Sequence, residues 1–274
     1  MTGADDSPHA FTLNASIASQ YEFRGLTQTN GKPAIQGGVD YSHSSGVYLG
    51  TWLSSVSWYG EQNAGSVSAP VPLSSPGSLG PPHAPNKSNS NSLEWDLYGG
   101  YKHSLGENWN YDLGVIHYAY PGTYDNVGAY RRPDTTEVYG ALGYRWLALK
   151  YSHTVSRYFF GTNESSGAGY LDLSVTVPIL GSGANLLLHA GHQTYPNHPN
   201  FGYFGNSGGN NTFYSYADYR IGLSKDWEKL TFSLAWTRAN TKATAPDGQT
   251  TAYLNASGKN IGGDRLALTV TRTF

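Results

Sequence analysis

Segments in which apolar and polar residues alternate recur along the whole chain, and the connections between them are alternately short and long. In residues 11–25 the odd positions are mostly apolar, as at Phe11 and Ile17, whereas the even positions are hydrophilic and end in Glu22 and Arg24. Side chains on a β-strand alternate between its two faces, so this segment is predicted to be a strand with one apolar and one polar face. Such a strand fits either a soluble sandwich or a membrane barrel whose apolar face contacts lipid.

The same alternation predicts about twelve strands in total, which makes the chain all-β. After the first, the predicted strands lie at about 34–42, 46–59, 93–102, 109–120, 135–146, 147–156, 171–179, 184–193, 212–224, 230–238 and 264–274.

Connection length decides between the two architectures. The short connections are 43–46, 104–108, 146–147, 180–183 and 225–229, and the long or irregular ones are 25–33, 60–92, 121–133, 157–168, 194–211 and 239–263. Tight turns at one rim and long loops at the other are typical of outer-membrane barrels. The sequence therefore predicts a transmembrane antiparallel up-and-down β-barrel of about 12 strands, with short periplasmic turns, long extracellular loops and both termini at the tight-turn rim.

One barrel domain is expected over residues 11–274, preceded by a disordered segment at 1–10. Residues 60–92 are dense in Ser, Pro, Gly and Asn, a composition that cannot build a core. We interpret them as a long surface loop rather than a domain linker, because the strand pattern resumes directly after them at Leu93.

Composition agrees with a barrel. Tyr contributes 22 residues and Gly 34, while Cys is absent. The mean hydropathy of −0.45 resembles that of a soluble protein, but a barrel needs apolar residues only at alternate strand positions. No run of eighteen apolar residues occurs, which excludes a transmembrane helix. The opening MTGADDSPHA has no signal-peptide pattern, so we expect that a signal peptide was removed and a new initiator Met added.

The two ends of the strands carry further signals. The last strand places Leu266, Leu268, Val270 and Phe274 on one face, and a terminal aromatic residue there resembles the recognition signal of barrel-assembly machinery. Aromatic residues near strand ends are predicted to form interfacial girdles in contact with outer-membrane lipid and lipopolysaccharide. They are Tyr21, Phe23, Trp58, Tyr59, Trp109, Tyr118, Tyr120, Trp146, Tyr158, Phe159 and Trp227.

The sequence contains no convincing motif for catalysis or metal binding. The stretch 205–209 fits GxSxG, but a nucleophile elbow needs a strand before and a helix after it, and a Gly/Asn-rich loop surrounds this one. His189 and His192 lie three apart on a predicted strand, so they face opposite sides and cannot chelate one metal ion. A formal net charge of −2 argues against nucleic acid as a partner. We expect no catalytic residue, no metal and no cofactor.

The polar faces hold the candidate functional residues. If the apolar faces point outward, the lumen is predicted to be lined by charged and amide side chains of both signs, with an acidic excess, and rings of charge in a wet pore select solutes. These are Gln20, Glu22, Arg24, Gln36, Asp40, Glu94, Asp96, Lys102, Asp112, Glu137, Arg145, Lys150, Asp172, Asp218 and Arg220.

Several segments resemble one known family. YEFRGLTQTNGKPAIQGGVDYSH, GVYLGTWLSSV, LEWDLYGGYK and YADYRIGLSKD are similar to the TorF-like porins of Gram-negative bacteria, a family of uncharacterised function, and the likeness runs from about residue 15 to 274. The resemblance implies an outer-membrane location and a channel, without catalytic residues or a substrate.

We therefore expect a non-enzymatic porin through which small hydrophilic solutes diffuse passively along a charged, Tyr-lined lumen. One alternative is a plugged barrel whose long loops bind a ligand or partner, because inward charges in a barrel of this size can pair and fill it. Further alternatives are an outer-membrane lipid hydrolase, which a Ser/His pair near one rim would indicate, and a soluble lectin-like sandwich.

Overall fold

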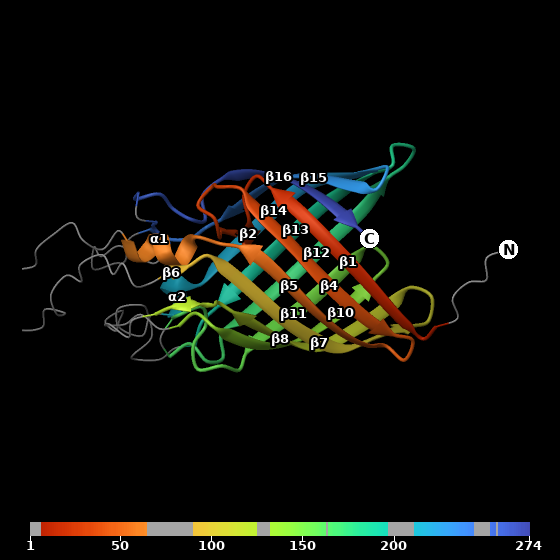
Figure 1. Cartoon of the computed structure of the whole chain (residues 1–274), viewed down its shortest axis with the longest axis horizontal. Coiled ribbons are helices and arrows are strands. Elements are labelled where there is room, and N and C mark those ends of the chain that lie inside the picture. The colour runs from red at the N-terminus through yellow and green to blue at the C-terminus, as the bar shows by residue number, and fades with distance from the viewer. Residues whose placement is uncertain are drawn as a thin grey trace, which may run out of the picture.

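A computed structural model gives the fold of the chain and describes residues 7–64, 90–124, 132–162, 164–196, 211–243, 253–255 and 257–274. Within these residues, twelve strands close into one antiparallel barrel in which each strand pairs with its neighbour in sequence (Figure 1). The first and last strands, β1 and β16, also pair and so complete the circle, with Ile17 opposite Val270. The barrel strands are β1 (His9–Ala18), β4 (Ala34–His43), β5 (Val47–Ser55), β7 (Leu93–Leu105), β8 (Trp109–Ala119), β10 (Thr135–Tyr144), β11 (Leu147–Thr154), β12 (Gly169–Ile179), β13 (Ala184–Thr194), β14 (Tyr216–Trp227), β15 (Leu230–Ala239) and β16 (Arg265–Thr273).

The predicted alternation of connection length is confirmed. Tight turns join β4 to β5, β7 to β8, β10 to β11, β12 to β13 and β14 to β15, all at one end of the barrel. β1 begins and β16 ends towards this same end, and the longer connections gather at the opposite end (Figure 1). We call these the tight-turn end and the loop end.

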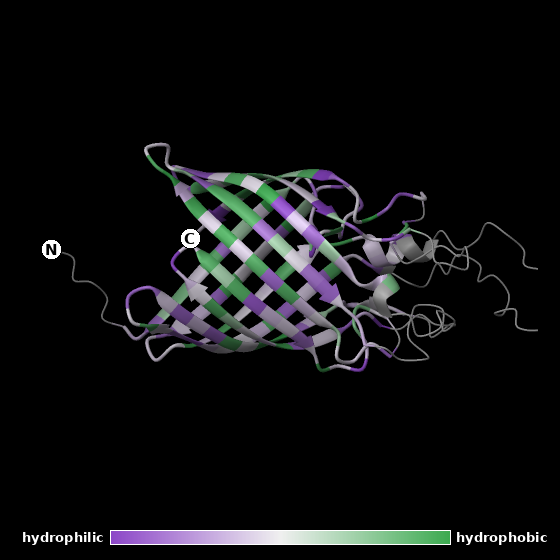
Figure 2. Cartoon of the chain, turned by 180° about the vertical axis from the view of Figure 1, so that it is seen from behind, coloured by the Kyte–Doolittle hydropathy of each residue, from purple (hydrophilic) through white to green (hydrophobic). Residues whose placement is uncertain are grey.

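Apolar residues occupy the outward strand positions, as the alternation predicts, and hydrophobic and hydrophilic residues alternate along the strands (Figure 2). Phe11, Ile35 and Leu113 are 72%, 73% and 57% exposed, and every barrel strand carries large exposed hydrophobic side chains. An exterior of this kind is unfavourable in water and is the property of barrels that cross a membrane. Neither of the two short helices within the described ranges has the length and hydropathy to span a bilayer.

The first strand is shorter than predicted. β1 ends at Ala18, where Ser19 and Gln20 bond to the backbone of β16 rather than continuing along β4. The chain then forms a small hairpin, β2 (Glu22–Phe23) and β3 (Leu26–Thr27). Alternation could not reveal this break, because a hairpin strand has two faces just as a wall strand does.

Other loop elements lie at the loop end. The strand predicted at 46–59 stops at Ser55 and gives way to α1 (Trp58–Ala64). β6 (Ser90–Asn91) pairs with β9 (Gly122–Thr123), and α2 (Asn211–Tyr214) precedes β14. Most of the predicted loop at 60–92, the GxSxG stretch at 205–209 and the first six residues of the predicted disordered segment lie outside the described residues.

Candidate functional site

Most of the predicted lumen residues lie on barrel strands, in phase with the inward positions. These are Gln36 and Asp40 on β4, Glu94, Asp96 and Lys102 on β7, Asp112 on β8, Glu137 on β10, Lys150 on β11, Asp172 on β12, and Asp218 and Arg220 on β14. Four others lie elsewhere. Gln20, Glu22 and Arg24 belong to the first loop, and Arg145 is in the tight turn after β10, where its Nε donates to Asn108.

The β2–β3 hairpin folds into the loop end of the lumen. Its turn is formed by Arg24 and Gly25, both with positive φ angles of 48° and 75°, as a two-residue hairpin turn of the primed type requires. Gly25 packs so closely against the wall that a Cβ there would overlap the Cβ atoms of Asp218 and Ala239. The tip of the hairpin therefore contacts the wall at β14 and β15, three and two strands from β1 around the barrel.

Arg24 fixes this tip in place. Its guanidinium donates two hydrogen bonds to the Glu137 carboxylate, at 2.7 and 3.0 Å, and a third to Gln193 at 3.1 Å. The side chains of Arg24 and Glu137 are only 7% and 1% exposed, and the guanidinium also lies 4.3 Å from the centre of the Tyr170 ring. Burial lowers the pKa of Arg24, but Glu137 outweighs that effect and raises it, so the guanidinium stays charged.

The base of the hairpin is held to two other parts of the loop end. The Tyr21 hydroxyl donates to Glu94 at 2.9 Å, and the Tyr120 hydroxyl donates to the other oxygen of the same carboxylate at 2.8 Å. The Gln28 carbonyl accepts from the backbone N–H of Trp58 at the start of α1. These bonds join the hairpin to β7, to the end of β8 and to α1.

Two aromatic clusters pack beside the hairpin at the loop end. One is built on Val56, Trp58, Tyr59, Tyr118 and Tyr120, with Tyr21, Phe23, Ile116, Tyr124 and Phe160 against it. The other is built on Phe213, Tyr214, Tyr216, Ala239, Tyr253 and Ile261, with Leu26 and Tyr195 against it. The hairpin and these clusters together are called the plug below.

The plug corrects part of the girdle prediction. Trp109, Trp146 and Trp227 are 46%, 52% and 64% exposed near the tight turns, where an interfacial girdle is expected. Seven of the other residues predicted for the girdle, Tyr21, Phe23, Trp58, Tyr59, Tyr118, Tyr120 and Phe159, lie inside the loop end instead. Position near a strand end does not distinguish a side chain that faces lipid from one that faces the lumen.

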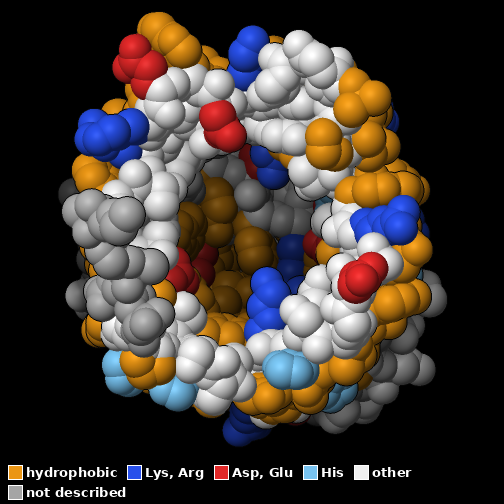
Figure 3. Space-filling model, turned by 90° about the vertical axis from the view of Figure 1, so that its right-hand side faces the viewer, with side chains coloured by type: hydrophobic (Ala, Val, Ile, Leu, Met, Phe, Trp, Pro, Cys, Tyr) orange, Lys and Arg blue, Asp and Glu red, His pale blue; other side chains and the backbone are white. Residues whose placement is uncertain are grey.

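Between the plug and the tight-turn end the lumen is hollow. Figure 3 looks into this end and shows a deep opening with charged side chains of both signs on its walls and hydrophobic side chains at its floor. One hollow of about 400 Å³ lies directly beneath the hairpin, against β11 to β15. A second of about 420 Å³ lies against β4 to β11, and Lys150 lines both.

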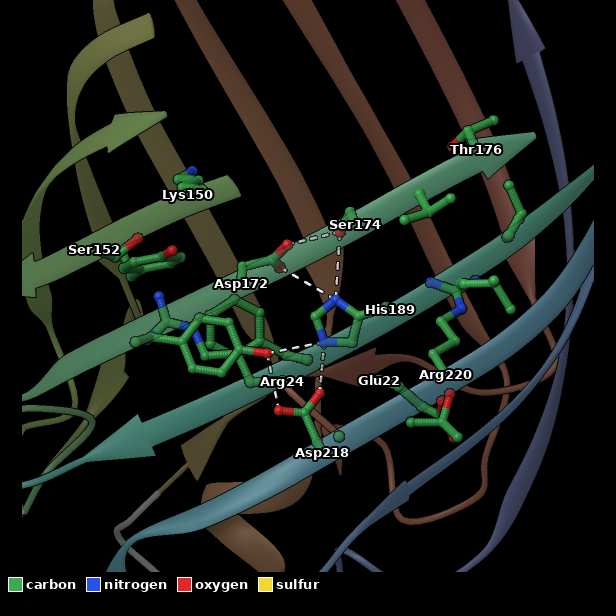
Figure 4. Close-up of a pocket in the computed structure, with 18 residues that line it drawn as sticks. Glu22, Arg24, Lys150, Ser152, Asp172, Ser174, Thr176, His189, Asp218 and Arg220 are labelled. Carbon is green, nitrogen blue, oxygen red and sulfur yellow. Dashed lines mark hydrogen bonds and ion pairs between the residues drawn. The ribbon is translucent and has the colours of Figure 1, made fainter. Parts of the chain in front are cut away.

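A hydrogen-bonded cluster lies on the wall of the hollow beneath the hairpin (Figure 4). His189 on β13 lies between two carboxylates, with Nε2 2.8 Å from Asp218 and Nδ1 3.3 Å from Asp172. The Tyr170 hydroxyl donates to Asp218 at 2.9 Å, and the Ser174 hydroxyl donates to Asp172 at 2.6 Å. His189, Tyr170 and Ser174 were not among the predicted lumen residues, although all three occupy polar positions of their alternating segments.

This cluster contains a Ser/His pair but lacks the geometry of a hydrolase. Ser174 Oγ lies 3.4 Å from His189 Nδ1, and its proton is donated to Asp172. Carboxylates only accept hydrogen bonds, so both ring nitrogens of His189 carry protons, and neither can take one from the serine. The pair also faces the lumen rather than lipid.

Tyrosines bond to the carboxylates of the second hollow. Tyr98 donates to Asp40 and Tyr48 donates to Asp112, each at 2.6 Å. Two of the carboxylates that give the predicted lumen its acidic excess thus accept hydrogen bonds from tyrosine hydroxyls. The signal for these tyrosines was their place on the face opposite the apolar residues, as for Tyr48 beside Val47 and Leu49.

Histidines elsewhere are not gathered into a metal site. His189 faces the lumen, whereas His192 is exposed on the outside of the same strand, as their spacing predicts. Across the described ranges, no group of three or more His, Asp or Glu side chains is arranged to hold a metal ion.

Comparisons with known proteins give a family but no activity. None of the curated proteins compared with the sequence matches it. Among solved structures, the chain is similar to a KdgM porin at 7% identity and a TM-score of 0.49, covering 96% of this chain and 99% of that one. It is also similar to LpxR from Salmonella typhimurium (11%, TM-score 0.41, 96% and 99%) and to the outer membrane protein OprD from Pseudomonas aeruginosa (11%, TM-score 0.36, 96% and 64%).

One family model covers almost the whole sequence, and it does not confirm the TorF-like name. The match extends over residues 2–274, so the chain belongs to the family described as "Bacterial protein of unknown function (Gcw_chp)".

Proposed function

We propose that this protein is an outer-membrane channel for small hydrophilic solutes, and that the β2–β3 hairpin restricts passage through it. The observation that carries the proposal is the contrast between an apolar exterior and a hollow, charged interior in one closed barrel. A barrel that served only as an anchor has no need of an interior that holds water. Passage would be passive, without cofactor or energy input.

The plug defines what such a channel must do. Arg24, Phe23 and the neighbouring aromatic clusters occupy the loop end, so a solute that enters there has to pass the hairpin or displace it. We propose that the hairpin sets the size limit of the channel. We also propose that Phe274, which is 62% exposed after β16, takes part in recognition by barrel-assembly machinery.

Single-channel conductance in a planar bilayer tests the proposal. The refolded wild-type chain is compared with a variant in which residues 22–27 are replaced by a short Gly/Ser link, and heat-modifiable migration on a gel verifies that each is a folded barrel. We expect a small or intermittent conductance from the wild type and a steady conductance, several-fold larger, from the variant. Arg157→Ala is the matched control, since Arg157 forms an exposed ion pair with Glu164 in another loop at the loop end.

A plugged barrel is the second candidate, because the hairpin and two aromatic clusters occupy the loop end. It predicts that the folded wild type does not conduct at all, whether or not the variant without the hairpin does. A hydrolase has less support, since both nitrogens of the lumen histidine are bonded to carboxylates.

A further inference from the structure

The hollow beneath the hairpin contains two cations that form no hydrogen bond or ion pair with a described carboxylate, although Glu22 lies near Arg220 and Asp172 lies near Lys150. Among the described residues, Lys150 Nζ makes no hydrogen bond or ion pair and lies 3.8 Å from the centre of the Tyr139 ring. The Arg220 guanidinium likewise has no hydrogen bond or ion pair to any described residue. A lumen ammonium or guanidinium without an anion retains its full capacity to bind one.

The carboxylates of this hollow differ, because most are already bonded. Asp172 and Asp218 share His189 and also accept from the Ser174 and Tyr170 hydroxyls. Glu137, just behind the hairpin, forms an ion pair with Arg24. The charged groups that remain to contact a solute are thus mainly cationic, although the sequence has an acidic excess in the lumen.

The space between the two cations is polar as well. Lys150 on β11 and Arg220 on β14 enter the hollow from its two sides, with the His189 cluster between them (Figure 4). Two buried oxygens near Arg220, Thr237 Oγ1 and Glu22 Oε1, form no hydrogen bond of good geometry within the described part of the chain, although the Thr237 hydroxyl interacts with the Glu22 carboxylate. Hydroxyl groups of a ligand would satisfy both.

The dimensions fit a short chain with an anionic group at each end. Three inter-strand spacings, roughly 14 Å, separate β11 from β14, and both side chains line the hollow. The hollow of about 400 Å³ lies within the range of small-molecule sites.

We infer that the hollow beneath the hairpin is a binding site for a small polyhydroxylated dicarboxylate, with one carboxylate held by Lys150 and the other by Arg220. The inference rests on the proposed channel function, in which this site selects the solute on the tight-turn side of the hairpin. Hydroxyl groups along the ligand would bond to Thr237, Glu22 and the serine hydroxyls of the wall.

Isothermal titration calorimetry on the full chain in detergent tests the site with three six-carbon probes. Glucarate has a carboxylate at both ends, gluconate at one end, and sorbitol at neither. We expect affinity to fall in that order, by about tenfold for each carboxylate lost. Equal affinity for all three probes, or no binding of glucarate, would overturn the inference.

Substitutions of Lys150 and Arg220 test whether each of these residues holds one carboxylate of glucarate. Lys150→Met and Arg220→Met should each reduce glucarate affinity to about that of gluconate, and the double variant should bind glucarate no better than sorbitol. Lys225→Met is the matched control, because Lys225 lies on β14 like Arg220 but faces outward, so its loss removes the same charge without touching the hollow. If that control weakens glucarate equally, general electrostatic attraction explains the binding and the site is wrong.

Two further measurements distinguish a loss of ligand binding from misfolding and from a loss of channel conductance. Lys150→Arg and Arg220→Lys should retain most of the binding, and heat-modifiable migration identifies folded preparations. Calorimetry does not depend on conductance, so a chain that binds the series but never conducts would contradict the channel and leave the site intact. A conducting chain without the affinity order would contradict the site alone.

Discussion

The loop end and the tight-turn end of this barrel are built from the same kinds of residue and reach opposite results. Both place tyrosines beside carboxylates in the lumen. At the loop end Tyr120 is 1% exposed and donates to Glu94, whereas at the other end Tyr98 donates to Asp40 on the wall of an open hollow. The difference arises because the first loop folds inward at one end only, which turns a wet wall into a packed core.

The comparison shows how a barrel of twelve strands can be either filled or open. Eight strands enclose a space that side chains fill, and sixteen leave an aqueous channel. With twelve, hollows of about 400 and 420 Å³ remain below the β2–β3 hairpin, and the hairpin narrows the lumen at the loop end only. The following predictions test whether that segment is what separates the two ends.

The largest effect is expected from Gly25→Val. Its side chain would collide with Asp218 and Ala239 and would also occupy a φ of 75°, so the tip of the hairpin must leave the wall. We expect a folded barrel with a conductance several-fold above that of the wild type. Gly31→Val is the matched control, since Gly31 has a similar φ of 79° but no atom within 4 Å of the added Cβ. Equal conductance of the two variants would mean that the contact at the tip does not close the lumen.

A smaller effect is expected from Glu137→Gln, which leaves the Arg24 guanidinium buried without its carboxylate. Loss of one partner of a buried pair costs about 3–5 kcal/mol, here in the free energy that docks the hairpin. Limited proteolysis at the hairpin should become much faster. Glu164→Gln breaks the exposed pair with Arg157 and should leave the rate of proteolysis there nearly unchanged. Unchanged protection of the hairpin in Glu137→Gln would show that Arg24 does not hold it.

The same chemical change at the two ends should give unequal effects. Tyr120→Phe removes a hydrogen bond from a buried carboxylate and should lower the free energy of unfolding by about 1–3 kcal/mol. Tyr98→Phe removes one from a carboxylate that water can reach in the hollow, and should cost well under 1 kcal/mol. Urea unfolding followed by Trp fluorescence measures both. Equal losses would indicate that the tight-turn end is as dry as the plug.

The smallest effect concerns pH at the outer edge of the plug. Burial raises the pKa of Glu61 on α1, but hydrogen bonds from Lys32, Ser57 and Asn30 outweigh it and lower the pKa below its ordinary 4.5. Ionised Glu61 therefore stabilises the folded state fully above about pH 4.5. This stabilisation is lost as the pH falls through the lower pKa that Glu61 has in the folded state. Because the pair with Lys32 is largely exposed, we expect a loss of less than about 1 kcal/mol. Proteolysis near α1 should accelerate in the wild type as the pH falls below about 4.5, and Glu61→Gln should abolish that dependence.

The arrangement of the strands was predictable from the sequence to within a few residues. β7, for example, was predicted at 93–102 and extends over Leu93–Leu105, and β12 ends at Ile179 as predicted. Period-two alternation is a local property, and it has to be strict in a strand that faces lipid on one side and water on the other. The inward phase of Asp40, Lys150 and Asp218 followed from the same pattern.

What the inward residues do was decided only by the tertiary structure. Arg24 is six residues beyond the end of β1, yet it bonds to Glu137 and Gln193, 113 and 169 residues further along the chain. A pattern with period two assigns a face but not a partner on the far side of a lumen. The sequence by itself determined a closed barrel with long loops at one end. The tertiary structure decided that the first of those loops folds inward, because only three-dimensional closure brings Glu137 and the wall around Gly25 to meet its tip.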